Sequence, residues 1–176
     1  PHKPRLRFAP YAWAKLLYFC HKGDTEIGGF GISRAEDPLL VEDFITVKQL
    51  VTAATVKFDD ESVADFFDAQ VDGGKRPEQF ARIWIHTHPG ECPEPSCTDE
   101  QTFLRVFGSC AWAIMFILAR GGETYARLRF NIGPGGALLV PAEVDFTAAF
   151  PASDHQAWRA EYDQNVQIEP DWPSMQ

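Results

Sequence analysis

The chain has 176 residues, of which 45% are hydrophobic and 13% aromatic, and this is enough apolar material to build one packed domain. Its 25 acidic and 16 basic residues give a formal net charge of −9, which would repel a phosphate backbone and argues against a nucleic-acid partner. The longest apolar run, residues 110–119, is far shorter than the roughly 20 residues of a membrane-spanning helix, so we expect no membrane association.

The cysteines indicate the compartment. Cys20, Cys92, Cys97 and Cys110 are too few and too scattered to form the disulfide framework of a small secreted protein. No charged and then apolar leader segment precedes the predicted fold. We therefore expect reduced thiols and a cytoplasmic protein.

The N-terminal half alternates helix and strand patterns. Residues 9–21 place Trp13, Leu16 and Cys20 at helical spacing, and a basic last turn followed by Gly23 ends this predicted helix. Turn-forming clusters separate the next apolar segments and favour a meander of short strands before a second helix. The three strands and the helix are expected over residues 26–33, 39–47, 54–58 and 61–71, respectively.

The C-terminal half is dominated by strand patterns. Its apolar runs show little alternation, which favours a sheet that is covered by other elements on both faces. The expected elements are a strand, a helix and three further strands, over residues 81–88, 98–106, 111–120, 124–132 and 137–144.

These patterns predict the α/β (α+β) class, with a central mixed β-sheet flanked by helices in a single domain. We assign residues 1–149 to that domain. Residues 150–176 are richer in proline and polar residues and contain one further expected helix over residues 153–165. We interpret residues 150–176 as a C-terminal appendage that packs on the domain or trails from it.

Two histidines on one predicted strand suggest a metal site. His86 and His88 are two residues apart, and side chains alternate along a strand, so both point to the same face. Asp99 follows eleven residues after His88, and the Pro-rich loop between them could return its carboxylate to the same point. Two nitrogens and one oxygen suit a catalytic zinc ion whose fourth position stays open for water.

Each of these features has a more ordinary explanation when it is considered alone. Strand histidines are often satisfied by backbone carbonyls, and Ser96 three residues before Asp99 is the pattern that caps the start of a helix. Glu26 would usually be an exposed charge at the start of a strand. Their joint occurrence changes this interpretation, because each supplies a different part of a hydrolytic zinc site.

A hydrolytic zinc site also needs groups that handle protons and charge. A buried carboxylate suits the role of the base that deprotonates the zinc-bound water, and Glu26 is the candidate. Strand alternation places it on one face with Gly28 and Phe30. Ser96 is the candidate donor to the negative charge that develops on the carbonyl oxygen during attack on an amide.

The spacing of these residues resembles that of JAMM metallopeptidases, also called JAB or MPN-domain proteases. In that family a Glu precedes His-x-His-Pro, and seven residues separate the second His from Ser-x-x-Asp. No motif position is missing from this chain, and the order of predicted elements over residues 8–147 is also similar. The motif stands here as Glu26, His86-Thr87-His88-Pro89 and Ser96-Cys97-Thr98-Asp99, with residues 89–95 as the spacer.

The resemblance implies one zinc ion per chain on His86, His88 and Asp99, with Glu26 as general base and Ser96 assisting at the tetrahedral intermediate. It implies an isopeptidase or peptidase that cleaves after the Gly-Gly tail of ubiquitin or a ubiquitin-like protein, in deconjugation or precursor processing. The compact chain is more similar to prokaryotic JAB proteins than to subunits of large eukaryotic complexes.

Other functions remain open at this point. A small-molecule or carrier-protein hydrolase, for example in sulfur transfer, would use the same zinc site, and some MPN-fold proteins are non-catalytic scaffolds. A structural zinc site could instead combine Cys92 and Cys97 with the two histidines. A zinc deaminase and a thermolysin-like protease do not fit, because the chain lacks His-x-Glu with Pro-Cys-x-x-Cys and lacks His-Glu-x-x-His.

Overall fold

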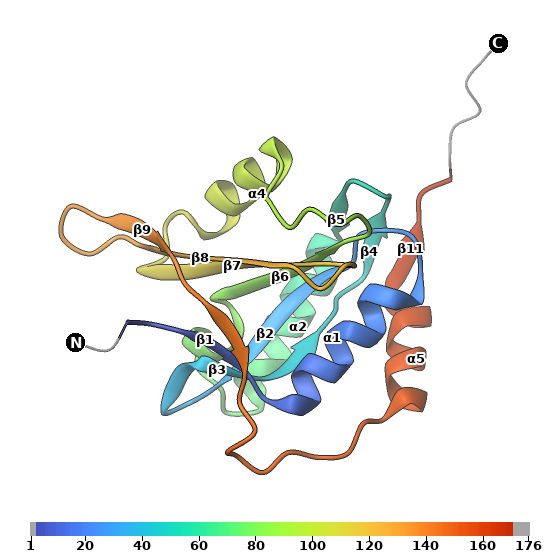
Figure 1. The fold of residues 1–176 in the computed structure, drawn as a ribbon, viewed down its shortest axis with the longest axis horizontal. Helices are drawn as coiled ribbons and strands as arrows, with labels where there is room; N and C mark the ends of the chain where they lie inside the picture. The colour runs from blue at the N-terminus through green and yellow to red at the C-terminus, as the bar shows by residue number, and fades with distance from the viewer. Residues whose placement is uncertain (1–2, 171–176) are drawn as a thin grey trace.

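The structure is a computed structural model that describes residues 3–170. Over that range the chain forms a large mixed sheet of eight strands, a second sheet of three strands and five helices (Figure 1). The predicted α+β class, with helices flanking a central mixed sheet, is confirmed. Within residues 3–170, no helix is both long enough and apolar enough to cross a bilayer.

Runs of strands are separated by single helices or a helix pair over residues 3–170. The elements of the N-terminal half are β1 (Leu6–Phe8), α1 (Pro10–Lys22), β2 (Gly28–Arg34), β3 (Asp37–Ile45), β4 (Gln49–Val51), β5 (Val56–Phe58), α2 (Asp60–Asp72) and α3 (Pro77–Phe80). The elements of the C-terminal half are β6 (Ile83–His88), α4 (Cys97–Phe107), β7 (Trp112–Ala119), β8 (Thr124–Phe130), β9 (Gly136–Leu139), β10 (Ala142–Val144), α5 (His155–Asn165) and β11 (Val166–Ile168).

The large sheet has the strand order β10-β1-β3-β2-β6-β7-β8-β9. Strand β6 lies near its middle, antiparallel to β2 and parallel to β7. The small sheet has the order β11-β4-β5, in which β11 runs parallel and β5 antiparallel to β4. All six residues of β6 are buried, so this strand holds its side chains in fixed surroundings on both faces.

Side chains alternate across the large sheet and form two separate cores. The first core contains Phe19 of α1 and Ile85 of β6. The second contains Trp84 of β6 together with Phe66 of α2 and Phe103 of α4. Figure 1 shows α1 and α4 on opposite sides of the sheet. The expectation that helices cover both faces is therefore confirmed.

Local signals set the boundaries of the first two helices. Pro10 occupies the first turn of α1, where its missing N–H is not needed, and the basic residues His21 and Lys22 close its last turn. At the start of α2, the Asp59 carboxylate accepts a hydrogen bond from the Ser62 N–H at 2.8 Å. Both helices lie within one or two residues of their predicted ranges.

Residues 137–144 form two strands, and the prediction of a single strand is wrong. β9 pairs with β8 at one edge of the large sheet, whereas β10 pairs with β1 at the other edge. Pro141 lies between them and has no N–H to donate, while its carbonyl accepts from the Leu6 N–H at 2.9 Å. The continuous apolar run conceals this change of partner. Four short elements, β1, β4, α3 and β11, also carry no recognisable pattern.

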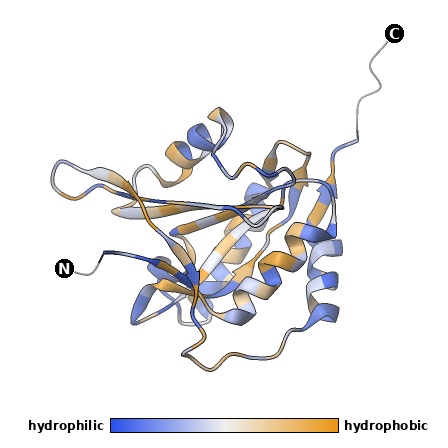
Figure 2. Cartoon of the chain, viewed as in Figure 1, coloured by the Kyte–Doolittle hydropathy of each residue, from blue (hydrophilic) through white to orange (hydrophobic). Residues whose placement is uncertain are grey.

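The predicted C-terminal helix is present as α5, and it packs on α1. Trp158 is only 1% exposed, and its indole N–H donates to the Tyr11 hydroxyl at 3.2 Å. Glu161 pairs with the buried Lys15 of α1 at 2.7 Å. Figure 2 shows a mostly hydrophilic α5, whereas α1, which lies against the sheet, is more hydrophobic. Residues 171–176 of the predicted appendage lie outside the described residues.

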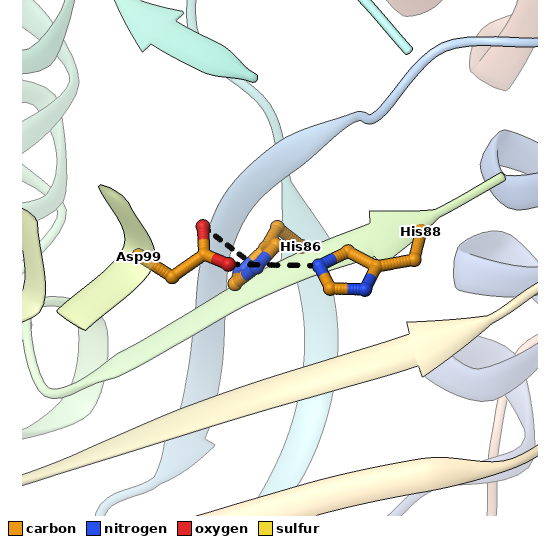
Figure 3. Close-up of side chains that lie close together, drawn as sticks. All are labelled: His86, His88 and Asp99. Carbon is orange, nitrogen blue, oxygen red and sulfur yellow. Dashed lines mark ion pairs between the residues drawn. The ribbon is translucent and has the colours of Figure 1, made fainter. Parts of the chain in front are cut away.

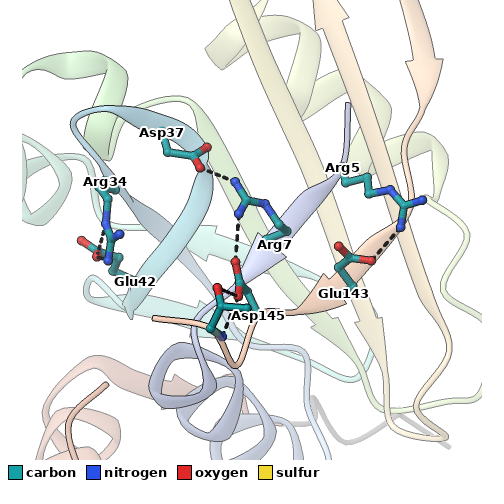
Figure 4. Close-up of polar contacts among 8 residues, drawn as sticks. Arg5, Arg7, Arg34, Asp37, Glu42, Glu143 and Asp145 are labelled. Carbon is teal, nitrogen blue, oxygen red and sulfur yellow. Dashed lines mark hydrogen bonds and ion pairs between the residues drawn. The ribbon is translucent and has the colours of Figure 1, made fainter. Parts of the chain in front are cut away.

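Ion pairs connect the strands at the β10 edge of the large sheet (Figure 4). Arg7 of β1 reaches Asp145 at 2.8 Å and also pairs with Asp37 at the start of β3. Arg5 pairs with Glu143 of β10 at 2.9 Å, but both side chains are about half exposed. The Arg7–Asp145 pair joins residues that are 138 positions apart, whereas the Arg7–Asp37 pair spans 30 positions.

Candidate metal centre

Strand β6 directs two histidines to the face that α4 covers. Ile83 and Ile85 point into the core under α1, so His86 and His88 share the opposite face with Trp84. His86 is fully buried and His88 is 9% exposed. The Trp84 indole stacks on the His86 imidazole with their centroids 4.4 Å apart, and this contact fixes the plane of the His86 ring.

The start of α4 supplies the third side chain. Ser96 is the N-cap, and its hydroxyl oxygen accepts from the Asp99 N–H at 3.2 Å. In return, one carboxylate oxygen of Asp99 accepts from the Ser96 N–H at 2.7 Å and from the Ser96 hydroxyl at 2.8 Å. The expected helix start at Ser96 is thus confirmed. This capping box holds Asp99 in the first turn, 6% exposed and facing β6.

The three predicted ligands converge. His86, His88 and Asp99 each offer one ligand atom, and these atoms lie within 4.8 Å of one another. Figure 3 shows the carboxylate of Asp99 directed toward both imidazoles, with Oδ1 3.3 Å from His86 Nε2 and Oδ2 3.7 Å from His88 Nε2. Within residues 3–170, this is the only cluster of three or more His, Cys, Asp or Glu side chains that could hold a metal ion.

Glu26 lies beside this cluster because of the pairing between β2 and β6. Gly28 is the register partner of His86, and the Ile27 carbonyl accepts from the Thr87 N–H at 2.9 Å. Two residues beyond the Gly28–His86 pair, the same antiparallel register sets Glu26 opposite His88. The Glu26 carboxylate lies 3.6 Å from His88 Nε2 and is 5% exposed. The predicted common face of Glu26 and Gly28 is confirmed.

The electrostatics of the cluster follow from burial and close contacts. The pKa of Glu26 is raised to about 7, mainly by burial and also by the charge of Asp99, while His88 opposes the rise. Burial would also raise the pKa of Asp99, but its contacts with His86 and His88 hold that pKa well below its usual range. Asp99 is therefore a carboxylate at neutral pH, whereas Glu26 can hold or release a proton there.

The two histidines differ in charge preference. Burial lowers the pKa of His86 below its usual value, so this imidazole is neutral and keeps a lone pair for a metal. Burial also lowers the pKa of His88, but contacts with Asp99 and with the Cys92 carbonyl outweigh it and leave the net pKa raised. Both rings thus respond to Asp99, which lies between them.

Several buried polar atoms of the cluster lack a hydrogen-bond partner among the described residues. They are His86 Nδ1, His86 Nε2, His88 Nε2 and Glu26 Oε2. Although His86 Nε2 is close to Asp99, the two groups are not aligned as a hydrogen bond. An unsatisfied buried polar group costs on the order of 1–3 kcal/mol of stability. Several such groups in one cluster are therefore unfavourable unless a ligand binds there. A cation coordinated by both Nε2 atoms and Asp99 would satisfy two of these four atoms, and the residues therefore fit a metal ion.

The cysteine loop supports the cluster through its backbone. His88 Nδ1 lies 2.9 Å from the Cys92 carbonyl oxygen, which can only accept, so Nδ1 carries the proton and Nε2 faces Asp99. The side chains of Cys92 and Cys97 are exposed, and neither belongs to the ligand cluster. The alternative of a structural zinc site built from these thiols is therefore not supported.

Arg120 is a second supporting residue that the sequence pattern does not reveal. Its N–H donates to the carbonyls of His88 and Gly90 at 2.9 and 3.0 Å. Its guanidinium donates to the Gly23 carbonyl at 2.7 Å and to the Asp24 carboxylate at 2.8 Å. Arg120 thus joins the loop after β6 to the segment that leads into Glu26, two regions more than sixty residues apart in sequence.

A cleft of about 1310 Å³ opens beside the metal face. Trp84 lines it from β6, the strand that carries the histidines, Thr98 and Thr102 line it from α4, and Val56 and Phe58 line it from β5. Residues of β11 also contribute to its wall. The cleft lies between α4 and the small sheet, and its lining includes Thr98, the neighbour of Asp99, but none of the cluster residues themselves.

Comparisons with known proteins add no family assignment. No protein-family model matches the chain, and no curated protein matches its sequence. The function must therefore be argued from the motif and the geometry.

Proposed function

We propose that this protein is a zinc-dependent hydrolase of amide bonds, with His86, His88 and Asp99 as zinc ligands and Glu26 as general base. The observation that carries the proposal is the convergence of three ligand atoms within 4.8 Å, with Glu26 3.6 Å from His88. Structural zinc sites are usually closed by four protein ligands, whereas catalytic sites use three and keep a position for water. Three ligands favour the catalytic kind.

When bound, zinc acts as a Lewis acid and lowers the pKa of a water molecule to about 7. Glu26 would accept a proton from the attacking water at its carboxylate and return it to the departing amine. The burial of Glu26 suits this role, because a pKa near 7 lets one carboxyl group both accept and release a proton at neutral pH.

Ser96 has two roles in this proposal. Its hydroxyl holds Asp99 in the ligand position through the 2.8 Å hydrogen bond. Donation to the oxyanion of the tetrahedral intermediate requires the hydroxyl to turn from Asp99 toward the substrate. The Ser96 N–H, which binds the same Asp99 oxygen at 2.7 Å, keeps Asp99 in place during that rotation.

The proposed substrate is the amide bond that follows the C-terminal tail of a ubiquitin-like protein, and the proposed fold family is JAMM/MPN. The complete spacing of Glu26, His86-x-His88 and Ser96-x-x-Asp99 supports both. The cleft between α4 and β5 has room for an extended peptide beside the cluster. The proposed location is the cytoplasm, where the exposed thiols of Cys92 and Cys97 would stay reduced.

The test measures zinc content and cleavage together in the parent protein and in Glu26→Gln. A fluorogenic peptide amide that ends in Gly-Gly, and a ubiquitin-like protein extended by a short peptide, serve as probes. We expect both proteins to hold zinc equally, and Glu26→Gln to lose turnover by about 100-fold or more, the usual contribution of a general base.

Three results would contradict parts of this proposal in different ways. Normal cleavage by Glu26→Gln would show that another group is the base. Zinc binding without cleavage of either probe by the parent protein would leave the scaffold or the small-molecule hydrolase as the better assignment. A parent protein that binds no zinc would refute the metal site itself.

A further inference from the structure

A buried glutamine lies next to the segment that carries the proposed base. Gln49, the first residue of β4, is 4% exposed. Its side-chain Oε1 accepts from the Gly28 N–H at 2.8 Å, and its Nε2 donates to the carbonyls of Gly28 and Val47 at 2.8 and 2.9 Å. The amide of Gln49 therefore pairs with both backbone groups of one residue of β2, as a neighbouring strand would.

The topology explains why a side chain takes this place. β3 pairs with β2 only as far as the partners Phe30 and Ile45, so the first residues of β2 have no strand on that side. On the other side, Gly28 is the register partner of His86. Unpaired backbone groups at a buried position are costly, and the Gln49 amide satisfies them.

A second contact joins β4 to the same segment. The Glu26 N–H donates to the carbonyl of Thr52, the residue directly after β4, at 2.9 Å. Gln49 thus holds Gly28, and Thr52, directly after β4, holds Glu26. These two contacts fix the backbone that directs the Glu26 carboxylate toward His88. β4 is itself held between β5 and β11 in the small sheet.

We propose that Gln49 is a positioning residue for Glu26 in the hydrolysis proposed above, on which this inference rests. The zinc ligands lie on β6 and α4, and neither element contacts Gln49 through a hydrogen bond within residues 3–170. Loss of the Gln49 amide therefore loosens the base and leaves the ligands in place. A displacement of the base by about 1 Å is enough to slow a reaction by roughly 100-fold.

The first experiment needs no substrate. Amide hydrogen exchange is measured by NMR on the zinc-loaded full chain, in the parent protein and in Gln49→Met, which keeps the size of the side chain and removes its hydrogen bonds. We expect exchange to accelerate at Gly28 and also at Glu26, by about 10-fold or more at each, because both amides depend on β4. Acceleration at Gly28 with a change below about twofold at Glu26 overturns the inference.

The second experiment is a double-mutant cycle on the Gly-Gly peptide amide, with zinc content measured in every variant. We expect Gln49→Met to keep its zinc and KM and to lose kcat by about 10-fold or more. In a Glu26→Gln background the same change should have almost no further effect on kcat, since its effect passes through Glu26. A purely structural glutamine would instead reduce both backgrounds alike, or lower only the thermal midpoint.

Two further variants keep the outcome clear. Gln49→Leu removes the same hydrogen bonds with an apolar side chain of similar volume, so it should show the same loss of kcat and substitutes for Gln49→Met if that variant fails to fold. Asn131→Ala removes another amide that donates to two backbone carbonyls, at 2.8 and 2.7 Å, on the distant β8–β9 connection, and should leave kcat unchanged.

The proposed function and this inference fail separately. If Glu26→Gln retains full activity, the proposed base is wrong, and the exchange at Glu26 still decides whether Gln49 holds that segment. If Glu26→Gln is inactive and Gln49→Met is fully active with unchanged exchange at Glu26, only the role of Gln49 is refuted.

Discussion

The two faces of strand β6 carry different kinds of side chain. On the face toward α1, Ile83 and Ile85 enter a core of buried hydrophobic residues. On the face toward α4, His86 and His88 follow Trp84 into a buried cluster that includes unpartnered polar atoms. Successive residues of one strand thus contribute to stability on one side and to chemistry on the other.

This difference means that burial on the α4 face stabilises the protein less than burial on the α1 face. Apolar burial stabilises the α1 face by about 25 cal/mol per Å² of buried area, and the buried polar groups there, Lys15 and the Trp158 indole, have partners. On the α4 face, His86 and Glu26 are buried without complete hydrogen bonding, which is unfavourable unless a ligand satisfies them. Substitutions on the two faces should therefore separate stability from metal binding.

The largest effect is expected for His88→Ala, which removes one of three ligands. Zinc affinity should fall by more than about 100-fold, beyond the effect usual for residues that only support a ligand. Zinc content after dialysis and the metal-dependent rise in thermal midpoint measure this loss. The exposed His21→Ala is the control and should bind zinc like the parent. Retained zinc in His88→Ala would remove His88 from the ligand set.

Trp158→Ala should have the opposite profile. Its indole is 1% exposed and packs against Tyr11 and Tyr18, so its loss should lower the free energy of unfolding by about 3–5 kcal/mol. Zinc affinity should stay unchanged, because Trp158 lies on the α1 side. Denaturant unfolding measures the first quantity and metal titration the second. Phe146→Ala, 72% exposed, should have almost no effect on either. Weaker zinc binding in Trp158→Ala would mean that the two faces are coupled.

Ser96→Ala should affect both quantities moderately. It removes the cap of α4, worth about 0.5–2 kcal/mol, and the hydroxyl that holds Asp99, which should weaken zinc binding by about 10- to 100-fold. Asp154→Ala removes the equivalent cap of α5 and is the matched control. It should destabilise the protein to a similar extent without changing zinc affinity. Equal zinc affinity in both variants would show that the Ser96 hydroxyl does not support the ligand.

The smallest effect is expected at the strand edge shown in Figure 4. Arg5→Ala breaks an ion pair between two side chains that are 58% and 43% exposed, so it should change the free energy of unfolding by less than about 1 kcal/mol. That change should diminish in high salt, which screens exposed charges. Unfolding at two salt concentrations checks it. A decrease in the free energy of unfolding well above about 1 kcal/mol would show that this ion pair stabilises the protein more than an exposed pair usually does.

Much of the local structure follows from sequence patterns. Helices α1, α2 and α4 have apolar periodicity and capping residues at their ends, and β7 of the large sheet forms an uninterrupted apolar run. The short elements escaped prediction, because β4 and β11 have three residues each and depend on pairing with strands that are distant in the sequence or equally short. The division of residues 137–144 depended on which strand was available at each edge.

The candidate ligands could be predicted because their geometry is local. His86 and His88 share a face by strand alternation, and Asp99 stands at a set position in a capped helix start. The supporting contacts could not be predicted. The Cys92 carbonyl and the two Arg120 contacts with the loop use backbone groups, which every residue has and no side-chain pattern reveals.

The sequence by itself determined which residues can bind a metal and which can act as a base, since side-chain chemistry and short spacings are properties of the chain. Only the tertiary structure decided that Glu26 stands opposite His88 and that Gln49 pairs with Gly28. Both contacts depend on the register between strands that lie far apart in sequence. That register is set by packing over the whole sheet, because a shift of one residue would turn every side chain to the other face.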